Sequence, residues 1–296
     1  MKTGTKKILM ILATLAVLCG IAFVVLLKSV TSSAVQLDED VLNQSIVNSP
    51  NVKLGNQVKI SADLFGGKFM YKQMKDVDGY IIPWSDVYAS YTNSGDNWYQ
   101  GNAMSETNGT TEFAENTNQK MMHFYKPDGS YPSVTNELEG LTGNTNKVME
   151  VAISFDRPYD LQEVVDFLPT NLNVAWLWLE AENTNELLDM AQVYGFEGLQ
   201  KPISGVNHKE VYAANYSNFL AGLDKLQNKT SKMADMYAKY SELSWNEVQV
   251  KGIIVTGQEK TSKPLRTTNS SAPQKSVQQQ TLYHISNHTN NPERKG

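Results

Sequence analysis

The chain has 296 residues, enough for one or two domains, and 41% of them are hydrophobic, which suffices for a folded core. Charge is uneven: residues 1–28 carry +4, residues 29–256 carry −13 and residues 257–296 carry +4. An acidic body repels phosphates, so we exclude nucleic acid as a partner. The single cysteine, Cys19, excludes an internal disulfide framework and a cysteine-cluster metal site.

Ile8–Leu27 is an uncharged apolar run of 20 residues. As a helix it would be about 30 Å long, the thickness of a bilayer core, so we predict one transmembrane helix here. Three lysines precede the run and place residues 1–7 in the cytoplasm and the remainder outside the cell membrane. The alternative is a signal peptide cleaved after Ala34, but the run is longer than the apolar part of such peptides.

Small side chains share one face of the predicted span. Ala13, Ala16 and Gly20 lie three and four residues apart, and such a face lets a second transmembrane helix approach closely. We therefore expect another membrane protein as a partner, with Ala13, Ala16 and Gly20 as the contact face.

The region after the span divides into a polar stalk over residues 28–50 and a β-rich, membrane-proximal region over residues 51–130. Gly66-Gly67 and Asp78-Gly79 predict turns between strands. The spacing of the aromatic and aliphatic residues between Trp84 and Tyr91 predicts a short helix after Pro83. Residues 93–119 are rich in Asn, Thr, Gly and Ser, which predicts a long loop, and residues 121–125 are predicted as a strand.

Residues 131–257 are predicted as an α+β domain, a small sheet covered by helices. Hydrophobic periodicity and capping signals predict strands over 148–155, 172–179 and 247–256, and helices over 161–168, 186–194 and 210–226, the last continuing toward Tyr240 after a break near Asn228. Residues 258–296 are polar with few apolar residues, which predicts a disordered tail.

The sequence carries no metal-ligand spacing and no cofactor motif, so we expect neither. Two alternatives to a regulatory protein remain. Asp156, Glu180 and Glu182 fall at strand ends, where paired carboxylates would serve a glycoside hydrolase. Trp84 and Trp98, with neighbouring tyrosines, would serve a module that binds envelope polysaccharide, although core packing explains large aromatics equally well.

Three stretches resemble the extracytoplasmic C-terminal domain of the sigma factor regulator family, the membrane anti-sigma factors of Firmicutes. They are Lys147–Leu168, which contains Phe155-Asp156-Arg157-Pro158-Tyr159, then Asn173–Ala181 with Trp176 and Trp178, and Gln249–Gly257 with Gly252, Thr256 and Gly257. Leu64–Gly66 and Tyr80–Tyr91 also resemble the membrane-proximal half of that family. The motif beginning at Phe155 is expected to form a turn between a strand and a helix.

The resemblance implies a non-enzymatic regulator that spans the membrane once and modulates an extracytoplasmic-function sigma factor through protein–protein contacts. Members of the family have a substantial cytoplasmic segment, whereas only residues 1–7 precede the span here. A stable interface buries roughly 800 Å² on each partner, more than seven residues supply. We therefore expect contact through another membrane protein, with direct binding of a sigma factor as the alternative.

Overall fold

The computed structural model describes residues 2–95, 98–100, 104–107, 111–114, 117, 119–129, 131, 147–168, 171–183, 188–199, 207–262 and 277–286. The chain forms two compact units. Unit 1 comprises residues 1–42, 55–72 and 86–102, and unit 2 comprises residues 43–54, 73–85 and 103–296. A long apolar helix, antiparallel sheets and shorter helices together make an α+β fold, as predicted.

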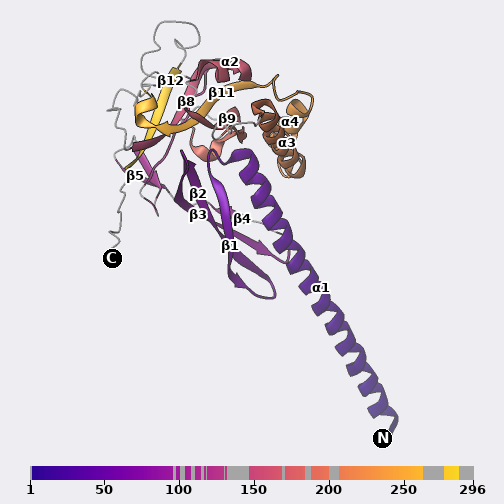
Figure 1. Ribbon diagram of the computed structural model, residues 1–296. Coiled ribbons are helices and arrows are strands. Elements are labelled where there is room, and N and C mark those ends of the chain that lie inside the picture. Colours follow the sequence, from indigo (N-terminus) through magenta and orange to yellow (C-terminus); the bar gives the residue numbers. More distant parts are fainter. Residues whose placement is uncertain are drawn as a thin grey trace, which may run out of the picture. The chain divides into compact units, whose positions relative to one another are not determined.

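Helix α1 (Lys2–Asn48) is one unbroken helix of 47 residues (Figure 1). Among the described residues it is the one helix long and apolar enough to cross a membrane, and none of its most apolar window is buried. The helix continues through the predicted stalk. There Val30, Ser33, Leu37 and Val41 are buried, and their spacing of three and four residues forms one stripe along the helix.

A four-stranded sheet has the strand order β1-β2-β3-β4, formed by β1 (Lys53–Ala62), β2 (Gly66–Val77), β3 (Tyr80–Thr92) and β4 (Trp98–Gln100). The helix predicted after Pro83 is wrong, because this segment belongs to β3. Val87, Ala89 and Tyr91 are buried at alternate positions, which is the period of a strand. The aromatic and β-branched residues here also favour a strand.

Two predicted turns have different outcomes. Asp78 and Gly79 form the turn between β2 and β3 with φ of 54° and 90°, the left-handed conformations that a two-residue hairpin turn requires. Gly66 and Gly67 instead begin β2. Their lack of side chains allows close packing, because a Cβ on Gly66 would lie 2.2 Å from the Tyr91 carbonyl oxygen.

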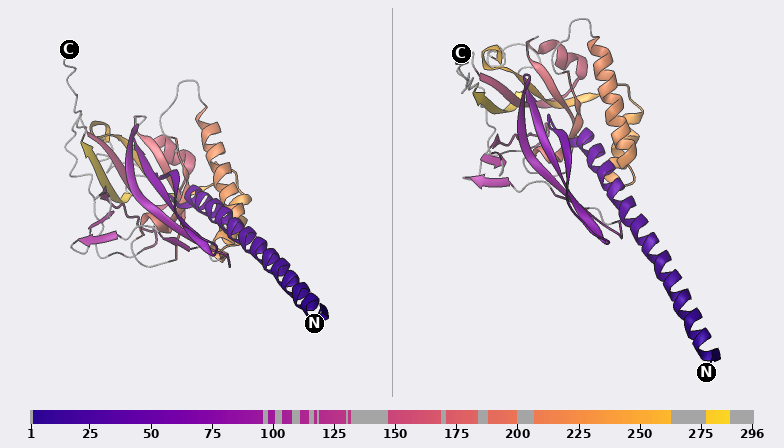
Figure 2. Two further views of the ribbon diagram at one scale, coloured as in Figure 1. Left: turned by 90° about the horizontal axis from the view of Figure 1, so that it is seen from below. Right: turned by 60° about the horizontal axis from the view of Figure 1, so that its bottom comes forward.

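Unit 2 contains an antiparallel sheet in the order β10-β9-β11-β8-β12. Its strands are β8 (Lys147–Asp160), β9 (Asn173–Ala181), β10 (Val193–Glu197), β11 (Gln249–Gln258) and β12 (Val277–Ser286). Figure 2 shows the helices α3 (His208–Leu226) and α4 (Ser231–Ser241) side by side at this sheet, and α2 (Leu161–Phe167) follows β8 directly. These strands and helices confirm the predictions for 148–155, 161–168, 172–179, 210–240 and 247–256.

Both faces of the sheet are buried over β8, β9, β10 and β11. The face that carries Val151, Ile153 and Phe155 packs in one cluster with α2, α3, α4 and Val47 of α1. The opposite face carries Ala152, Trp178 and Ile254 and is covered by residues from elsewhere in unit 2. Because neither face meets solvent, the strands are nearly continuously hydrophobic instead of alternating.

Three further predictions are wrong over the described residues. The helix predicted over 186–194 is a single 3-10 turn, Met190–Gln192, closed at Asp189 by reciprocal side-chain hydrogen bonds and followed by β10. The strand predicted over 121–125 is reduced to one bridge between Phe124 and Leu188. The loop predicted over 93–119 contains β4, β5 (Met104–Thr107), β6 (Thr111–Ala114) and β7 (Gln119–Lys120), which pair locally.

The tail predicted to be disordered from residue 258 contains two described elements. The 3-10 helix η3 (Glu259–Ser262) follows β11, and β12 pairs with residues 147–155 of β8. Prediction from composition considers only the apolar surface that a segment can bury. It misses the main-chain hydrogen bonds that an open sheet edge offers to a polar strand.

Candidate partner-binding cleft

The family-like motif Phe155–Tyr159 lies at a bulge inside β8. Tyr159 is opposite Val250 and Ser154 is opposite Gly252, so residues 155–158 face the single residue Lys251 on β11. Such a bulge bends the strand and redirects its side chains. The predicted turn is therefore a bulge, and the strand continues through it to Asp160.

The bulge separates buried from exposed side chains. Phe155 is buried in the helix-covered core, where its ring meets the Tyr159 ring edge to face at 5.5 Å. The Tyr159 hydroxyl donates a hydrogen bond to Asp156 at 3.0 Å, and the Arg157 guanidinium lies 4.6 Å from the centre of the Tyr159 ring. Arg157 and Pro158 are exposed. Tyr159 therefore anchors the motif and holds Arg157 at the surface.

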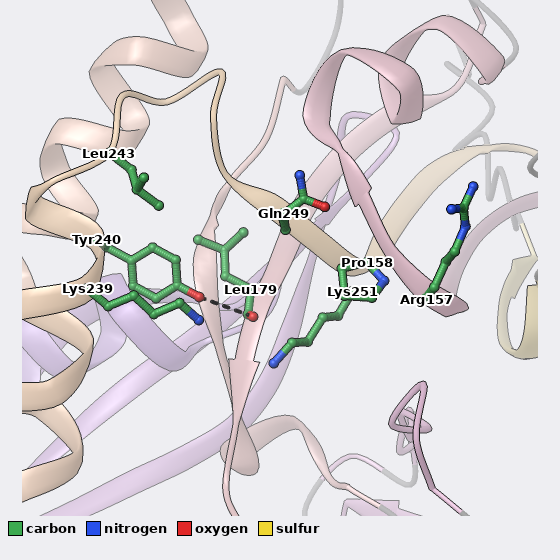
Figure 3. A pocket seen from close by; sticks show the side chains of 8 residues that line it. All are labelled: Arg157, Pro158, Leu179, Lys239, Tyr240, Leu243, Gln249 and Lys251. Carbon is green, nitrogen blue, oxygen red and sulfur yellow. Dashed lines mark hydrogen bonds between the residues drawn. The ribbon is translucent and has the colours of Figure 1, made fainter.

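The bulge forms one wall of a cleft of about 420 Å³ in unit 2 (Figure 3). Its lining residues come from β8, β9, β11, α4 and the segment after α4, namely Arg157, Pro158, Leu179, Lys239, Tyr240, Leu243, Gln249 and Lys251. The lining thus combines three cationic side chains with apolar and aromatic ones, a composition suited to an acidic, partly apolar peptide segment.

A charge network stands beside the cleft. Glu180 pairs with Lys251 at 2.7 Å and with Lys239 at 3.0 Å. Burial raises the pKa of Glu180, but its hydrogen bonds and charge attraction to Lys251 and then Lys239 outweigh this and lower the pKa to about 2. Glu180 is therefore ionised at neutral pH and offsets one of the three positive charges.

Tyr240 fixes the apolar wall. Its hydroxyl donates a hydrogen bond to the Leu179 carbonyl oxygen at 3.3 Å, drawn as the dashed line in Figure 3. The Tyr240 ring is buried in the core cluster that joins the sheet with α3 and α4. Burial raises the pKa of Tyr240, so the phenol stays neutral and keeps donating at physiological pH.

Trp176, Trp178 and Gly252 are packing residues. Trp178 is buried against Phe124 at 5.4 Å, and its indole N–H donates to the Glu180 carbonyl oxygen at 2.7 Å. A Cβ on Gly252 would lie 2.5 Å from the Ile153 carbonyl oxygen and 2.7 Å from the Trp178 ring. A glycine is therefore needed at this position of β11 for the Trp178 ring to pack against it. Trp176 is buried in the same cluster.

Thr256 and Gly257, at the other end of β11, are also buried. Thr256 is paired with Glu150 and Asn173 in the sheet, and its hydroxyl accepts from the Asn173 amide at 3.4 Å. Asn173 also donates to Asp78 at 3.0 Å. This end of β11 thus builds a polar cluster inside unit 2, away from the bulge at residues 155–158.

A buried ion pair in that region escaped the sequence analysis. Lys75 on β2 is 1% exposed, Glu150 on β8 is 0% exposed, and their charged atoms are 2.8 Å apart. Asn51 donates to Glu150 at 2.6 Å, and the Lys75 ammonium lies 3.9 Å from the centre of the Trp84 ring. Burial lowers the pKa of Lys75, against the opposing attraction of Glu150. The sequence signal was Glu150, the single charge in the strand predicted over 148–155, whereas Lys75 is adjacent to Asp76 and gives no such signal.

The hydrolase alternative receives no support from the described side chains. Glu180 is held by two lysines, Glu182 accepts from the Tyr194 hydroxyl, and Asp156 accepts from Tyr159. No group of three or more His, Cys, Asp or Glu in the described part of the chain is placed to hold a metal ion.

The polysaccharide alternative rests on exposed aromatics. Trp84 is only 7% exposed, so its ring packs in the core instead of offering a stacking surface. The side chain of Trp98 lies outside the described residues.

The predicted helix face of Ala13, Ala16 and Gly20 lies on the exposed part of α1. A Cβ on Gly20 would have nothing within 4 Å, so the face is open to a neighbour. Its use as a contact remains a prediction.

A family model described as sigma factor regulator C-terminal matches residues 138–273. The matched region holds β8, β9 and β11, and therefore the bulge, both tryptophans and Gly252–Gly257. The match confirms the predicted resemblance to the sigma factor regulator family for this region. It does not extend to Leu64–Gly66 or Tyr80–Tyr91, where the resemblance stays a prediction. No curated protein and no solved structure matches the chain.

Proposed function

We propose, from the sigma factor regulator C-terminal region that spans residues 138–273, that this chain is a single-pass regulator of an extracytoplasmic-function sigma factor. Residues 1–7 lie in the cytoplasm, α1 crosses the cell membrane, and the folded residues after it lie outside and bind a protein. The observation that carries the proposal is the family match together with one exposed apolar helix on the same chain. The protein acts through contacts and not through catalysis.

Helix α1 supports a coupling between the membrane and the regulatory region. Its last turns, which belong to unit 2, bring Val47 into the helix-covered core. The packing there is tight, because a Cβ on Gly222 of α3 would lie 2.9 Å from Val47. A helix with no break between the apolar run and Val47 transmits rotation or tilt in either direction.

The cleft is the proposed docking site for the partner outside the membrane. Its three cations and single neighbouring anion favour an acidic segment, and Leu179, Leu243 and Tyr240 supply apolar contact. Arg157 and Lys239 are both exposed, but Lys239 and Lys251 pair with Glu180, whereas Arg157 stands apart from that network. It is therefore the side chain best suited to meet a partner carboxylate.

The second partner surface is the face of Ala13, Ala16 and Gly20 within the span. A membrane protein that packs there connects the chain to the cytoplasm, where the sigma factor is held. Direct binding of the sigma factor is the alternative.

The test is crosslinking in intact membranes followed by affinity recovery of the full-length chain. We expect recovery of a membrane protein with its bound sigma factor, or of the sigma factor itself. Arg157→Glu should abolish recovery of a partner that binds outside the membrane, while Lys209→Glu, a charge reversal at an exposed site on α3, should not. Failure to recover either class of protein would contradict the proposal.

A further inference from the structure

The loop between β1 and β2 exposes two apolar side chains at its tip. Leu64 is 40% exposed and Phe65 is 64% exposed. We propose that Leu64 and Phe65 insert into the membrane interface next to α1, as a second contact of unit 1 with the lipid surface. This inference rests on the proposed insertion of Ile8–Leu27 into the membrane.

The loop exposes these side chains while several of its backbone groups are hydrogen-bonded within unit 1. The Asp63 carboxylate accepts hydrogen bonds from the backbone N–H of Phe65 at 2.7 Å and of Gly66 at 3.0 Å. The Asp63 N–H donates to the Gly66 carbonyl oxygen at 2.8 Å. Polar groups paired in this way need no water, which lowers the cost of entering the interface.

Hydrogen bonds set the depth of the loop along α1. The Asn93 N–H donates to the Phe65 carbonyl oxygen at 2.7 Å, and the Ser29 hydroxyl donates to the Asn93 carbonyl oxygen at 2.6 Å. Ser29 is two residues, about 3 Å of helix, beyond Leu27, where the apolar run ends. Figures 1 and 2 draw this end of the hairpin beside the middle of α1, within unit 1.

A lipid surface is the occupant that this position favours. The apolar run ends at Leu27, and the exposed Lys28 follows at the level of lipid headgroups. Phenylalanine and leucine are the side chains that interfacial segments bury at the boundary of headgroups and acyl chains. The loop therefore adds a second lipid contact of unit 1 to the one proposed for α1.

The experiment uses the full-length chain in nanodiscs that hold one chain each. A nitrobenzoxadiazole label is attached at Phe65→Cys in a Cys19→Ser background, and at Leu64→Cys as a second position that keeps Phe65. The matched control is Ile81→Cys in β3, an apolar site 60% exposed that follows the turn at Asp78 and Gly79. Folding of each variant is checked by its thermal melt.

We expect the labels at 64 and 65 to emit at shorter wavelength than the label at 81, to be quenched several-fold more by lipids brominated near the headgroup, and to be less accessible to iodide. Equal iodide access at 65 and 81 would overturn the inference. A label on the native Cys19 tests the membrane insertion of Ile8–Leu27 separately from the loop contact. If lipids brominated deep in the acyl chain quench it while residue 65 stays in water, only the loop contact fails.

Iodide access to the Cys19 label would overturn both the membrane insertion and the loop contact. Discs that hold two chains test the other occupant. Shielding of residue 65 only in those discs would show that a second copy covers the loop, which also overturns the lipid contact.

Discussion

The buried ion pair between Lys75 and Glu150 makes the sharpest prediction about stability. Lys75→Met keeps the apolar stem of the side chain and removes the ammonium. Among the described residues, Glu150, which is 0% exposed, would then keep only its hydrogen bond from Asn51 to offset a buried charge. Removing one partner of a buried ion pair costs about 3–5 kcal/mol.

The matched control lies on the same strand. Lys72 pairs with Asp86 at 2.7 Å, but its side chain is 53% exposed, so Lys72→Met should cost about 0–1 kcal/mol. For a chain of this size each kcal/mol lowers the melting temperature by about 2–4 °C. Thermal melts of the full-length protein in detergent should therefore fall by roughly 6–20 °C for Lys75→Met and by a few degrees at most for Lys72→Met.

A double variant separates loss of the pair from loss of packing. Lys75→Met combined with Glu150→Leu removes both charges, so it should be more stable than Lys75→Met alone. A Lys75→Met protein that melts with the Lys72→Met control would refute the reasoning, because it would show that Glu150 is not held as a buried charge.

Three further predictions concern the cleft, its packing and the membrane segment. Lowering the pH from about 5 to 2 should remove roughly 3 kcal/mol of the stability that Glu180 contributes. The folded pKa of Glu180, about 2, lies below its ordinary 4.5, so its stabilising contribution is complete only above pH 4.5 and is lost as the pH falls towards 2. Denaturant titrations should show a smaller loss over this pH range in Glu180→Gln. Gly252→Ala should destabilise the protein by about 1–3 kcal/mol in the same titrations, whereas Gly20→Ala, with open space around it, should not. Removing residues 1–28 should release a soluble protein with one cooperative melt, and aggregation of that fragment would contradict the predicted division between membrane segment and folded region.

The elements predicted from the sequence succeeded where one local signal dominated. Asp78-Gly79 forms its turn because both residues accept positive φ, and α3 and α4 follow their periodic hydrophobic faces. The helix predicted after Pro83 was wrong because the apolar residues between Trp84 and Tyr91 fit the period of a strand as well as the period of a helix. Pairing with β2 and burial of Val87, Ala89 and Tyr91 selected the strand.

The candidate cleft was only partly predictable. Phe155–Tyr159 was recognised as a motif, but a turn and a bulge have the same local composition. The register of β11 against β8, which opposes four residues to Lys251, decides between them. Lys239 and Tyr240 of α4 also line the cleft, although they lie some 80 residues after Arg157 in the chain. No local sequence pattern predicts that contact.

By itself the sequence determined the apolar helix, the α+β class and the resemblance of residues 138–273 to the sigma factor regulator C-terminal model, because each depends on the order of residue types along the chain. Only the tertiary structure decided that Glu180 bridges Lys239 and Lys251, that Lys75 and Glu150 share a buried site, and that Phe65 lies level with Ser29. These contacts join residues 28 to 75 positions apart. Such distances close only when sheets choose their register and helices their packing, and a local stretch of sequence does not encode that choice.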